Sequence, residues 1–204
     1  MPETTTLRDL FTDELRDILH GERQLMKALP KMAKAATSPD LRKALEDHLA
    51  ETEGQVTRLE KAFELIDEPV KTKVCKGLQG IIEEGSEAIK EHTRGAALDA
   101  AIIGGGQRAE HYEMAAYGTV MAWAKSLGHD DVAALLSKTL DEEKAADKKL
   151  SQLAEAGINE AAQTDDADET DDAQEETGTR RARTMPAASG ANGRGRGTKR
   201  SSKR

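Results

Sequence analysis

The sequence KAATSPDLRKAL, residues Lys34–Leu45, predicts a sharp reversal between two long helices. Ser38 is a favoured N-cap residue, and Pro39 is favoured at the first helical position because it has no amide hydrogen to leave unbonded. Apolar residues recur at helical spacing on both sides of this stretch, over residues 7–36 and 41–63. Two long helices joined by so short a turn must pack antiparallel, so the stretch predicts a helical hairpin.

A second hairpin is predicted further along the chain. A third long helix should run from near Ala97 to Gly128, where SLGHDD supplies a C-terminal glycine and new capping aspartates, and a fourth from about Asp131 to Glu155. The long connection between the hairpins contains a shorter helix in VCKGLQGIIEEGSEAIKEH, residues 74–92, which three glycines weaken. We therefore predict an all-α fold, a four-helix bundle with a helical crossover between helices two and three.

The composition agrees with a helical protein. Hydrophobic residues make up 37% of the chain and aromatic residues 2%, and there are only five prolines. The single cysteine, Cys75, cannot form an intrachain disulfide, and the N-terminal residues show no secretory signal, so a cytoplasmic location is expected. No apolar run approaches the length needed to cross a bilayer, so no membrane contact is expected.

We assign residues 1–158 to the bundle and residues 159–204 to an acidic and then basic tail. The tail has no apolar periodicity, so disorder is expected. Its basic part would contact nucleic-acid phosphates without sequence preference, although it has no aromatic residues for stacking. The alternative is a solvated or self-associating tail, because the acidic block nearly balances the basic one. The basic candidates are Arg180, Arg181, Arg183, Arg194, Arg196, Lys199, Arg200, Lys203 and Arg204.

Each long helix carries a glutamate near its middle, on or beside its apolar stripe. These residues are Glu22, Glu51, Glu110 and Glu143, and Glu113 follows Glu110 by one turn. In an antiparallel hairpin, residues equally far from the turn lie at the same height. The mean of the residue numbers of Glu22 and Glu51 falls at the turn beside Thr37, and the mean for Glu113 and Glu143 falls at Gly128. All four helices are therefore expected to bring carboxylates to a similar depth.

Several carboxylates in a dry bundle repel one another unless they are protonated or bind cations. First-row metal ions would resolve this repulsion. His48 is the better histidine candidate because it lies three residues before Glu51 on the same face, whereas the helix turns His111 about 100° away from Glu110. Tyr117, two turns from Glu110, is a candidate hydrogen-bonding neighbour. The alternative for any one glutamate is that it reaches solvent or pairs with a Lys or Arg.

Residues 7–156 resemble the YciE/YciF-type ferritin-like family. The resemblance is carried by LRDLFTDELRDILHGERQLMKALPKMAKAATSPDLRKALEDHLAETEGQVTRLEKAFELI, QRAEHYEMAAYGTVMAWAKSLG and LLSKTLDEEKAADKKL. It implies a ferritin-like bundle, related in architecture to rubrerythrins and manganese catalases, which is dimeric and associated with stress responses. The resemblance also implies a role for each glutamate of this chain. Glu22 and Glu110 would be the lone glutamates of their helices, and Glu113 would match the extra glutamate of rubrerythrin-like sites. Glu51 and Glu143 would take the remaining glutamate roles.

The chain departs from the wider di-metal class in its histidines. In that class a Glu-x-x-His motif stands on one helix of each hairpin, but here Gly54 and Ala146 occupy the histidine positions. His48 would compensate from the other side of Glu51. We therefore expect a site for one or two iron or manganese ions that handles oxygen or peroxide, as in a rubrerythrin-like or catalase-like oxidoreductase. The alternative is a non-catalytic, homodimeric stress protein whose basic tail associates with DNA.

Overall fold

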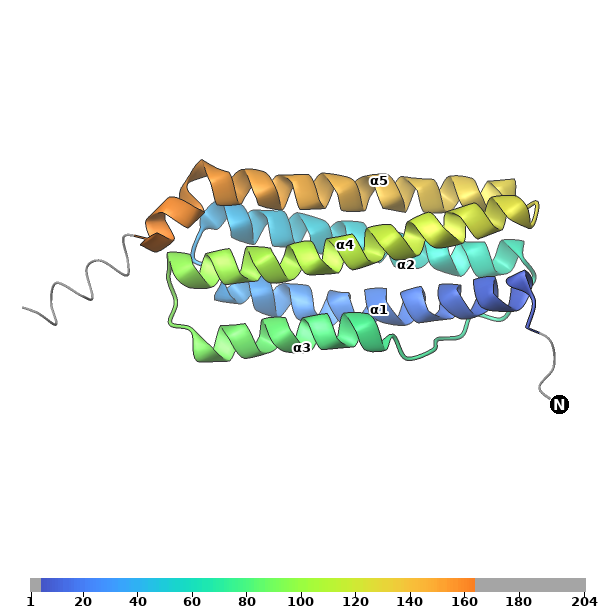
Figure 1. Cartoon of the computed structure of the whole chain (residues 1–204), viewed down its shortest axis with the longest axis horizontal. Helices are drawn as coiled ribbons and strands as arrows, with labels where there is room; N and C mark the ends of the chain where they lie inside the picture. Colours follow the sequence, from blue (N-terminus) through green and yellow to red (C-terminus); the bar gives the residue numbers. More distant parts are fainter. Residues whose placement is uncertain (1–4, 164–204) are drawn as a thin grey trace, which may run out of the picture. The chain divides into compact units, whose positions relative to one another are not determined.

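The computed structural model describes residues 5–163, and this range holds five α-helices and no strand (Figure 1). The predicted basic tail residues and most of the acidic block lie outside the described residues. A π-helical turn, η1, follows α5, and residues 159–163 are helical as well. The helices are α1 (Leu7–Ala35), α2 (Pro39–Leu65), α3 (Lys76–Glu91), α4 (Ala96–Ser126) and α5 (Asp130–Leu153), with η1 over Ala154–Ile158.

Four of the helices form the bundle. The hairpins α1–α2 and α4–α5 pack side by side, with α2 against α5 and α1 against α4, while α3 lies along α1 and α4 (Figure 1). The predicted all-α bundle with a helical crossover is therefore confirmed. Among the described helices, none is both long and apolar enough to cross a membrane.

The first hairpin turn is held by the residues that predict it. The Ser38 hydroxyl accepts a hydrogen bond from the amide of Leu41 at 3.3 Å, and Pro39 is the first residue of α2. The carboxylate of Asp99 on α4 accepts hydrogen bonds from the amides of Thr37 at 2.8 Å and Ser38 at 2.7 Å. This buried contact fixes the α1–α2 turn against the start of α4.

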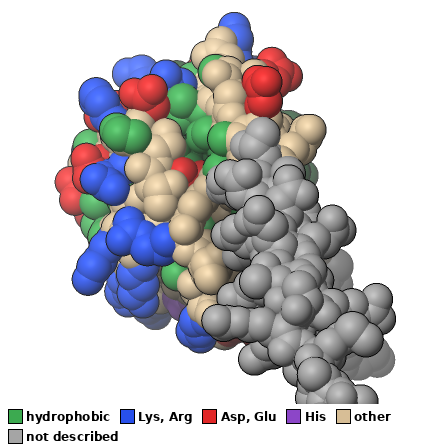
Figure 2. Space-filling model, turned by 90° about the vertical axis from the view of Figure 1, so that its left-hand side faces the viewer, with side chains coloured by type: hydrophobic (Ala, Val, Ile, Leu, Met, Phe, Trp, Pro, Cys, Tyr) green, Lys and Arg blue, Asp and Glu red, His purple; other side chains and the backbone are tan. Residues whose placement is uncertain are grey.

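Basic side chains gather on one side of the end of the bundle where α1 ends. Figure 2 looks onto this end and shows Lys and Arg side chains on its left and lower left, with acidic side chains among them and hydrophobic atoms exposed beside them. Arg42 donates to the carbonyl oxygens of Ala33 and Ala36, and Arg94 donates to that of Lys34. Cations at a helix C-terminus stabilise the helix by satisfying its last carbonyl groups and complementing its dipole.

Glycines let the crossover helix and α5 approach α4 closely. Gly104, Gly105 and Gly106 have low helix propensity, and α4 passes through all three without a break. A Cβ atom at Gly106 would lie only 3.0 Å from Leu150 Cδ1, and one at Gly77 of α3 would lie 2.5 Å from the Tyr112 ring. At Gly77 and Gly106, the intrinsic cost of glycine in a helix is therefore offset by close packing.

The core consists of two apolar clusters, one toward each end of the bundle. The first includes Phe11, Phe63 and Tyr117, and the second includes Leu41 and Ile103. On each of the four bundle helices, buried polar residues fall between these clusters. They are Glu22 on α1, His48, Thr52 and Gln55 on α2, Glu110 and Glu113 on α4, and Glu143 on α5.

Candidate metal centre

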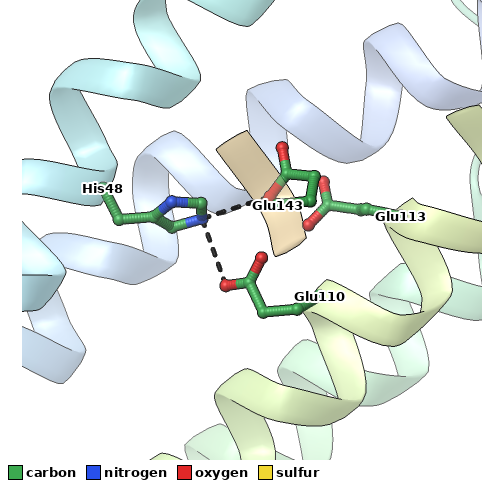
Figure 3. A group of neighbouring side chains, drawn as sticks. All are labelled: His48, Glu110, Glu113 and Glu143. Carbon is green, nitrogen blue, oxygen red and sulfur yellow. Dashed lines mark ion pairs between the residues drawn. The ribbon is translucent and has the colours of Figure 1, made fainter. Parts of the chain in front are cut away.

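Four side chains meet in the polar layer between the two apolar clusters: His48, Glu110, Glu113 and Glu143. Each offers a possible ligand atom, and these atoms all lie within 4.8 Å of one another (Figure 3). His48 comes from α2, Glu110 and Glu113 from α4, and Glu143 from α5, and all four residues are buried. The structure thus brings together residues from both hairpins, as the matched heights along the sequence predict.

His48 points one ring nitrogen into this cluster and the other away from it. Its Nε2 lies 3.3 Å from Glu110 Oε1 and 3.9 Å from Glu143 Oε2 (Figure 3). Its Nδ1 lies 3.4 Å from Glu51 Oε2. A carboxylate accepts hydrogen bonds, so Glu51 favours the tautomer with the proton on Nδ1. In the neutral ring this leaves the Nε2 lone pair directed at the cluster.

The predicted ligand Glu51 is therefore not brought into the cluster. Its side chain is 47% exposed, and its contact is with the outer edge of the His48 ring. The helix explains this position, because three residues at 100° each place Glu51 about 60° to one side of His48 and of the buried stripe of α2. Glu51 orients the histidine instead of facing the other carboxylates.

The predicted ligand Glu22 lies in the same layer but outside the group of four. It is fully buried, and Tyr117 donates its hydroxyl hydrogen to Glu22 Oε1. Tyr117 as a hydrogen-bonding neighbour is thereby confirmed. The second oxygen of Glu22 has no hydrogen-bond partner among the described residues.

We expect Tyr117→Phe to lower the free energy of unfolding of the metal-free protein by about 1–3 kcal/mol, because it strips a buried carboxyl of its donor. Chemical denaturation of the chelator-treated protein measures this. Tyr112→Phe on the same helix is the matched comparison. It removes only a contact to the Cys75 thiol at 3.3 Å, a weak partner, and should cost less. Equal losses in the two variants would contradict the assigned role of Tyr117.

Gln55 belongs to the site but was not among the predicted residues. It is fully buried on α2 and donates its amide hydrogen to Glu143 Oε1. The signal was present in the sequence, since Gln55 follows Thr52 and precedes Leu59 at helical spacing on the buried stripe. A neutral amide can hold Glu143 in place without cancelling its negative charge.

The remaining carboxyl oxygens of the site are largely unsatisfied. Within residues 5–163, no hydrogen-bond partner reaches Glu110 Oε2, Glu143 Oε2 or either oxygen of Glu113. The same range contains no buried Lys or Arg, so His48 is the basic side chain that directly reaches these carboxyls. Arg58 is only partly buried and pairs with Glu142 beside the site. Buried carboxylates without cationic partners are costly, so each such oxygen needs an explanation.

Burial is the main influence on the ionisation of these groups. It raises the pKa of Glu110 to about 7, of Glu22 to about 8 and of Glu143 to about 9. The charges of neighbouring carboxylates add to each rise, whereas a hydrogen bond with Glu143 opposes it at Glu110 and one from Tyr117 opposes it at Glu22. For Glu113 the pKa is raised well above the ordinary value by burial and by the charges of neighbouring carboxylates. Burial opposes the charged form of His48, but Glu51, Glu143 and Glu22 outweigh it and raise the pKa of His48.

The donor set fits a divalent first-row metal ion. One imidazole nitrogen and oxygens from three carboxyls converge from three helices, and iron and manganese accept this mixture of ligands. A bound cation would replace the missing cationic partners and satisfy the unpaired oxygens. His111, which we expected to face away from Glu110, lies outside the group. It is exposed, and its Nε2 lies 3.3 Å from Asp147 Oδ1.

A hollow leads from the surface to this group, and we call it the polar hollow for the charged residues on its outer part, although apolar side chains form most of its wall. It has a volume of about 280 Å³ and lies between α2 and α5. His48 and Glu110 are at its inner end, while Asp47, Glu51 and Lys149 line it further out. Charged side chains along its wall suit the passage of a hydrated ion.

Comparisons with known proteins agree on one family. Residues 6–163 match the family model described as a domain of unknown function, DUF892. Protein YciF of Escherichia coli strain K12 is 40% identical over 159 residues, covering 78% of this chain and 96% of that protein.

Solved structures give the same result. The crystal structure of the E. coli stress protein YciF matches with a TM-score of 0.74 at 39% identity, over 76% of this chain and 99% of that one. YcfI of Rhodopseudomonas palustris, described as a candidate structural protein, matches with a TM-score of 0.71 at 43% identity, over 74% and 96%. The protein XCC3681 of Xanthomonas campestris shares the fold at 21% identity, with a TM-score of 0.62 over 78% and 98%.

Proposed function

The chain belongs to the DUF892 family and is a YciF-type protein, and on this premise we propose that it is a metal-binding stress protein. It holds one or two iron or manganese ions in the polar layer of its bundle. The small oxidant on which it acts is dioxygen or peroxide, so the protein would be an oxidoreductase. The stress role is that of the similar E. coli protein, which is described as a stress protein.

The observation that supports this proposal most strongly is the set of buried, unpaired carboxyl oxygens on Glu22, Glu110, Glu113 and Glu143. A structural ion pair would bring a Lys or Arg to these oxygens, yet the described chain buries no such residue. Hydrophobic side chains of similar size would pack the same layer at lower cost. A layer of acids facing one another therefore points to a cation as its partner.

The residues divide into three roles. His48, Glu110, Glu113 and Glu143 would hold the metal, whose chemistry is electron exchange with a small oxidant. Glu51 holds the Nδ1 proton of His48 and so keeps Nε2 available, and Gln55 positions Glu143. Glu22 and Tyr117 form a buried donor–acceptor pair beside the ligands and can hold a proton there.

Metal analysis of the purified protein, combined with assays of oxygen and peroxide consumption, tests this function. We expect bound iron or manganese and a consumption rate that falls when the metal is removed by a chelator and returns when it is restored. A folded protein that binds neither metal, even when both are supplied without oxygen, would contradict the proposal.

A second candidate function is a non-catalytic, homodimeric stress protein whose basic tail associates with DNA. It is favoured by the similarity to YcfI, which is described as a candidate structural protein. The same metal analysis separates the two candidates, because a purely structural bundle has no need of a bound cation. DNA binding would depend on the C-terminal basic residues and would weaken steeply with added salt.

A further inference from the structure

A second, apolar cavity reaches the candidate metal centre from the side opposite the polar hollow. It has a volume of about 100 Å³ and lies where α3 covers α1 and α4. Its walls include Ile82 of α3 and Ile102 of α4, and its inner end is formed by His48 and Glu110. The two hollows share only these two polar residues and Leu45 and Leu150.

Apolar side chains form most of the wall of this cavity, and its polar groups come from few residues besides His48 and Glu110. Lys27 and Lys31 line it too, but both are exposed to solvent. The hydroxyl of Ser86 donates to the carbonyl oxygen of Ile82 at 2.9 Å, so its hydrogen is already used. A water molecule needs two to four polar partners in a cavity. Hydrogen peroxide forms hydrogen bonds in the same way, so it is better matched to the polar hollow beside Glu51.

The size of the cavity limits its occupant. An apolar cavity of about 150 Å³ in another protein stays dry and binds benzene or xenon. The present cavity is smaller, so it suits an apolar molecule of very few atoms. We propose that it admits dioxygen and holds it beside His48 and Glu110. This inference rests on the proposed function, because it names dioxygen as the oxidant. It also gives dioxygen a route to the site that differs from the route of the cation.

Glycine 85 offers a way to close the cavity without disturbing the fold. Gly85 lines the cavity on α3, and a Cβ atom placed on it meets no atom within 4 Å. Gly85→Leu should therefore fill the space and also favour the helix. Gly80→Leu is the matched control, because Gly80 lies on the same helix with equally free space but does not line the cavity.

Dioxygen is paramagnetic, so it can be located directly by nuclear magnetic resonance. The experiment uses the full-length chain without metal, labelled at its isoleucine methyl groups, and compares methyl relaxation under dioxygen and under nitrogen. We expect selective enhancement at Ile102, which lines the cavity and is buried, and little at the equally buried Ile18 and Ile103 outside it. The half-buried isoleucines of the wall, Ile81, Ile82 and Ile89, also meet dioxygen from the solvent, so they report on the cavity only through the change between variants.

Gly85→Leu should abolish this selective enhancement, and Gly80→Leu should retain it. Equal enhancement of all buried isoleucines in the wild-type protein would overturn the inference, and this result needs no variant. Enhancement that persists in a folded Gly85→Leu protein would also overturn it. Because no metal is present, a failure of metal binding would refute the proposed function and leave this measurement unaffected.

Discussion

The metal-free protein is expected to lose stability as the pH rises from about 4.5 to about 9. The pKa values of Glu110, Glu22 and Glu143 are raised by burial from 4.5 to about 7, 8 and 9. A folded-state pKa above the unfolded value means that folding favours the protonated carboxyl. That contribution is complete below the unfolded pKa and is lost as the pH rises through the folded pKa.

The expected slope is large. Each carboxyl that must take a charge on unfolding contributes about 1.4 kcal/mol per pH unit between its two pKa values. His48 acts in the same direction, because its pKa is raised above the unfolded value as well. Thermal unfolding of the chelator-treated protein at a series of pH values measures the effect, and a profile that is flat or rises across this range would contradict it.

Bound metal should reverse this trend. Metal binding needs a neutral His48 and charged carboxylates, so it releases protons and strengthens with pH. At a free metal concentration of 100 times the dissociation constant, binding stabilises the folded state by about 2.7 kcal/mol. The difference in melting temperature between the metal-loaded and metal-free protein should therefore widen from mildly acidic to mildly alkaline pH.

The bundle could be predicted because its determinants are local. Thr6 and Ser38 cap helices whose apolar residues recur at helical spacing, and short turns leave antiparallel packing as the only solution. The depth of the glutamates followed from counting residues away from each turn. Helix ends differed from the expectation by a few residues, as at Leu153, where a π-helical turn replaces the expected last α-helical turn.

The roles within the site depended on packing that spacing does not specify. Glu51 and His48 lie on the same side of α2. Which of them enters the buried layer depends on the rotation of α2 about its axis where it packs against α5. Gln55 was not predicted because the search for site residues followed charged side chains and histidines, and an amide is neutral. The apolar cavity could not be foreseen at all, since it depends on how α3 docks over Gly105 and its neighbours.

Replacing Glu110 by Gln should have the second large effect. The change keeps the shape of the side chain but removes the carboxylate that we propose as a metal ligand and that lies 3.3 Å from His48 Nε2. Metal affinity should fall by at least tenfold, since even the loss of a residue that supports a ligand costs about 10- to 100-fold. The metal-free variant should be at least as stable as the wild type above neutral pH, because repulsion among the buried carboxyls is relieved.

A matched control is available on α5. Asp141 lies two residues from Glu143, is 73% exposed and pairs with Lys144. Asp141→Asn removes the same charge from the surface of the bundle. It should leave both the metal content and the pH profile of stability unchanged.

The most direct test of the central claim is the metal content per chain. It is measured side by side for the wild-type protein, Glu110→Gln and Asp141→Asn, after loading with iron(II) under nitrogen and removal of excess metal. The expected result is one or two ions per chain in the wild type and in Asp141→Asn, and clear loss from a folded Glu110→Gln protein. Equal metal content in all three proteins, or none in the folded wild type, would contradict the assignment of this buried acidic layer as a metal centre.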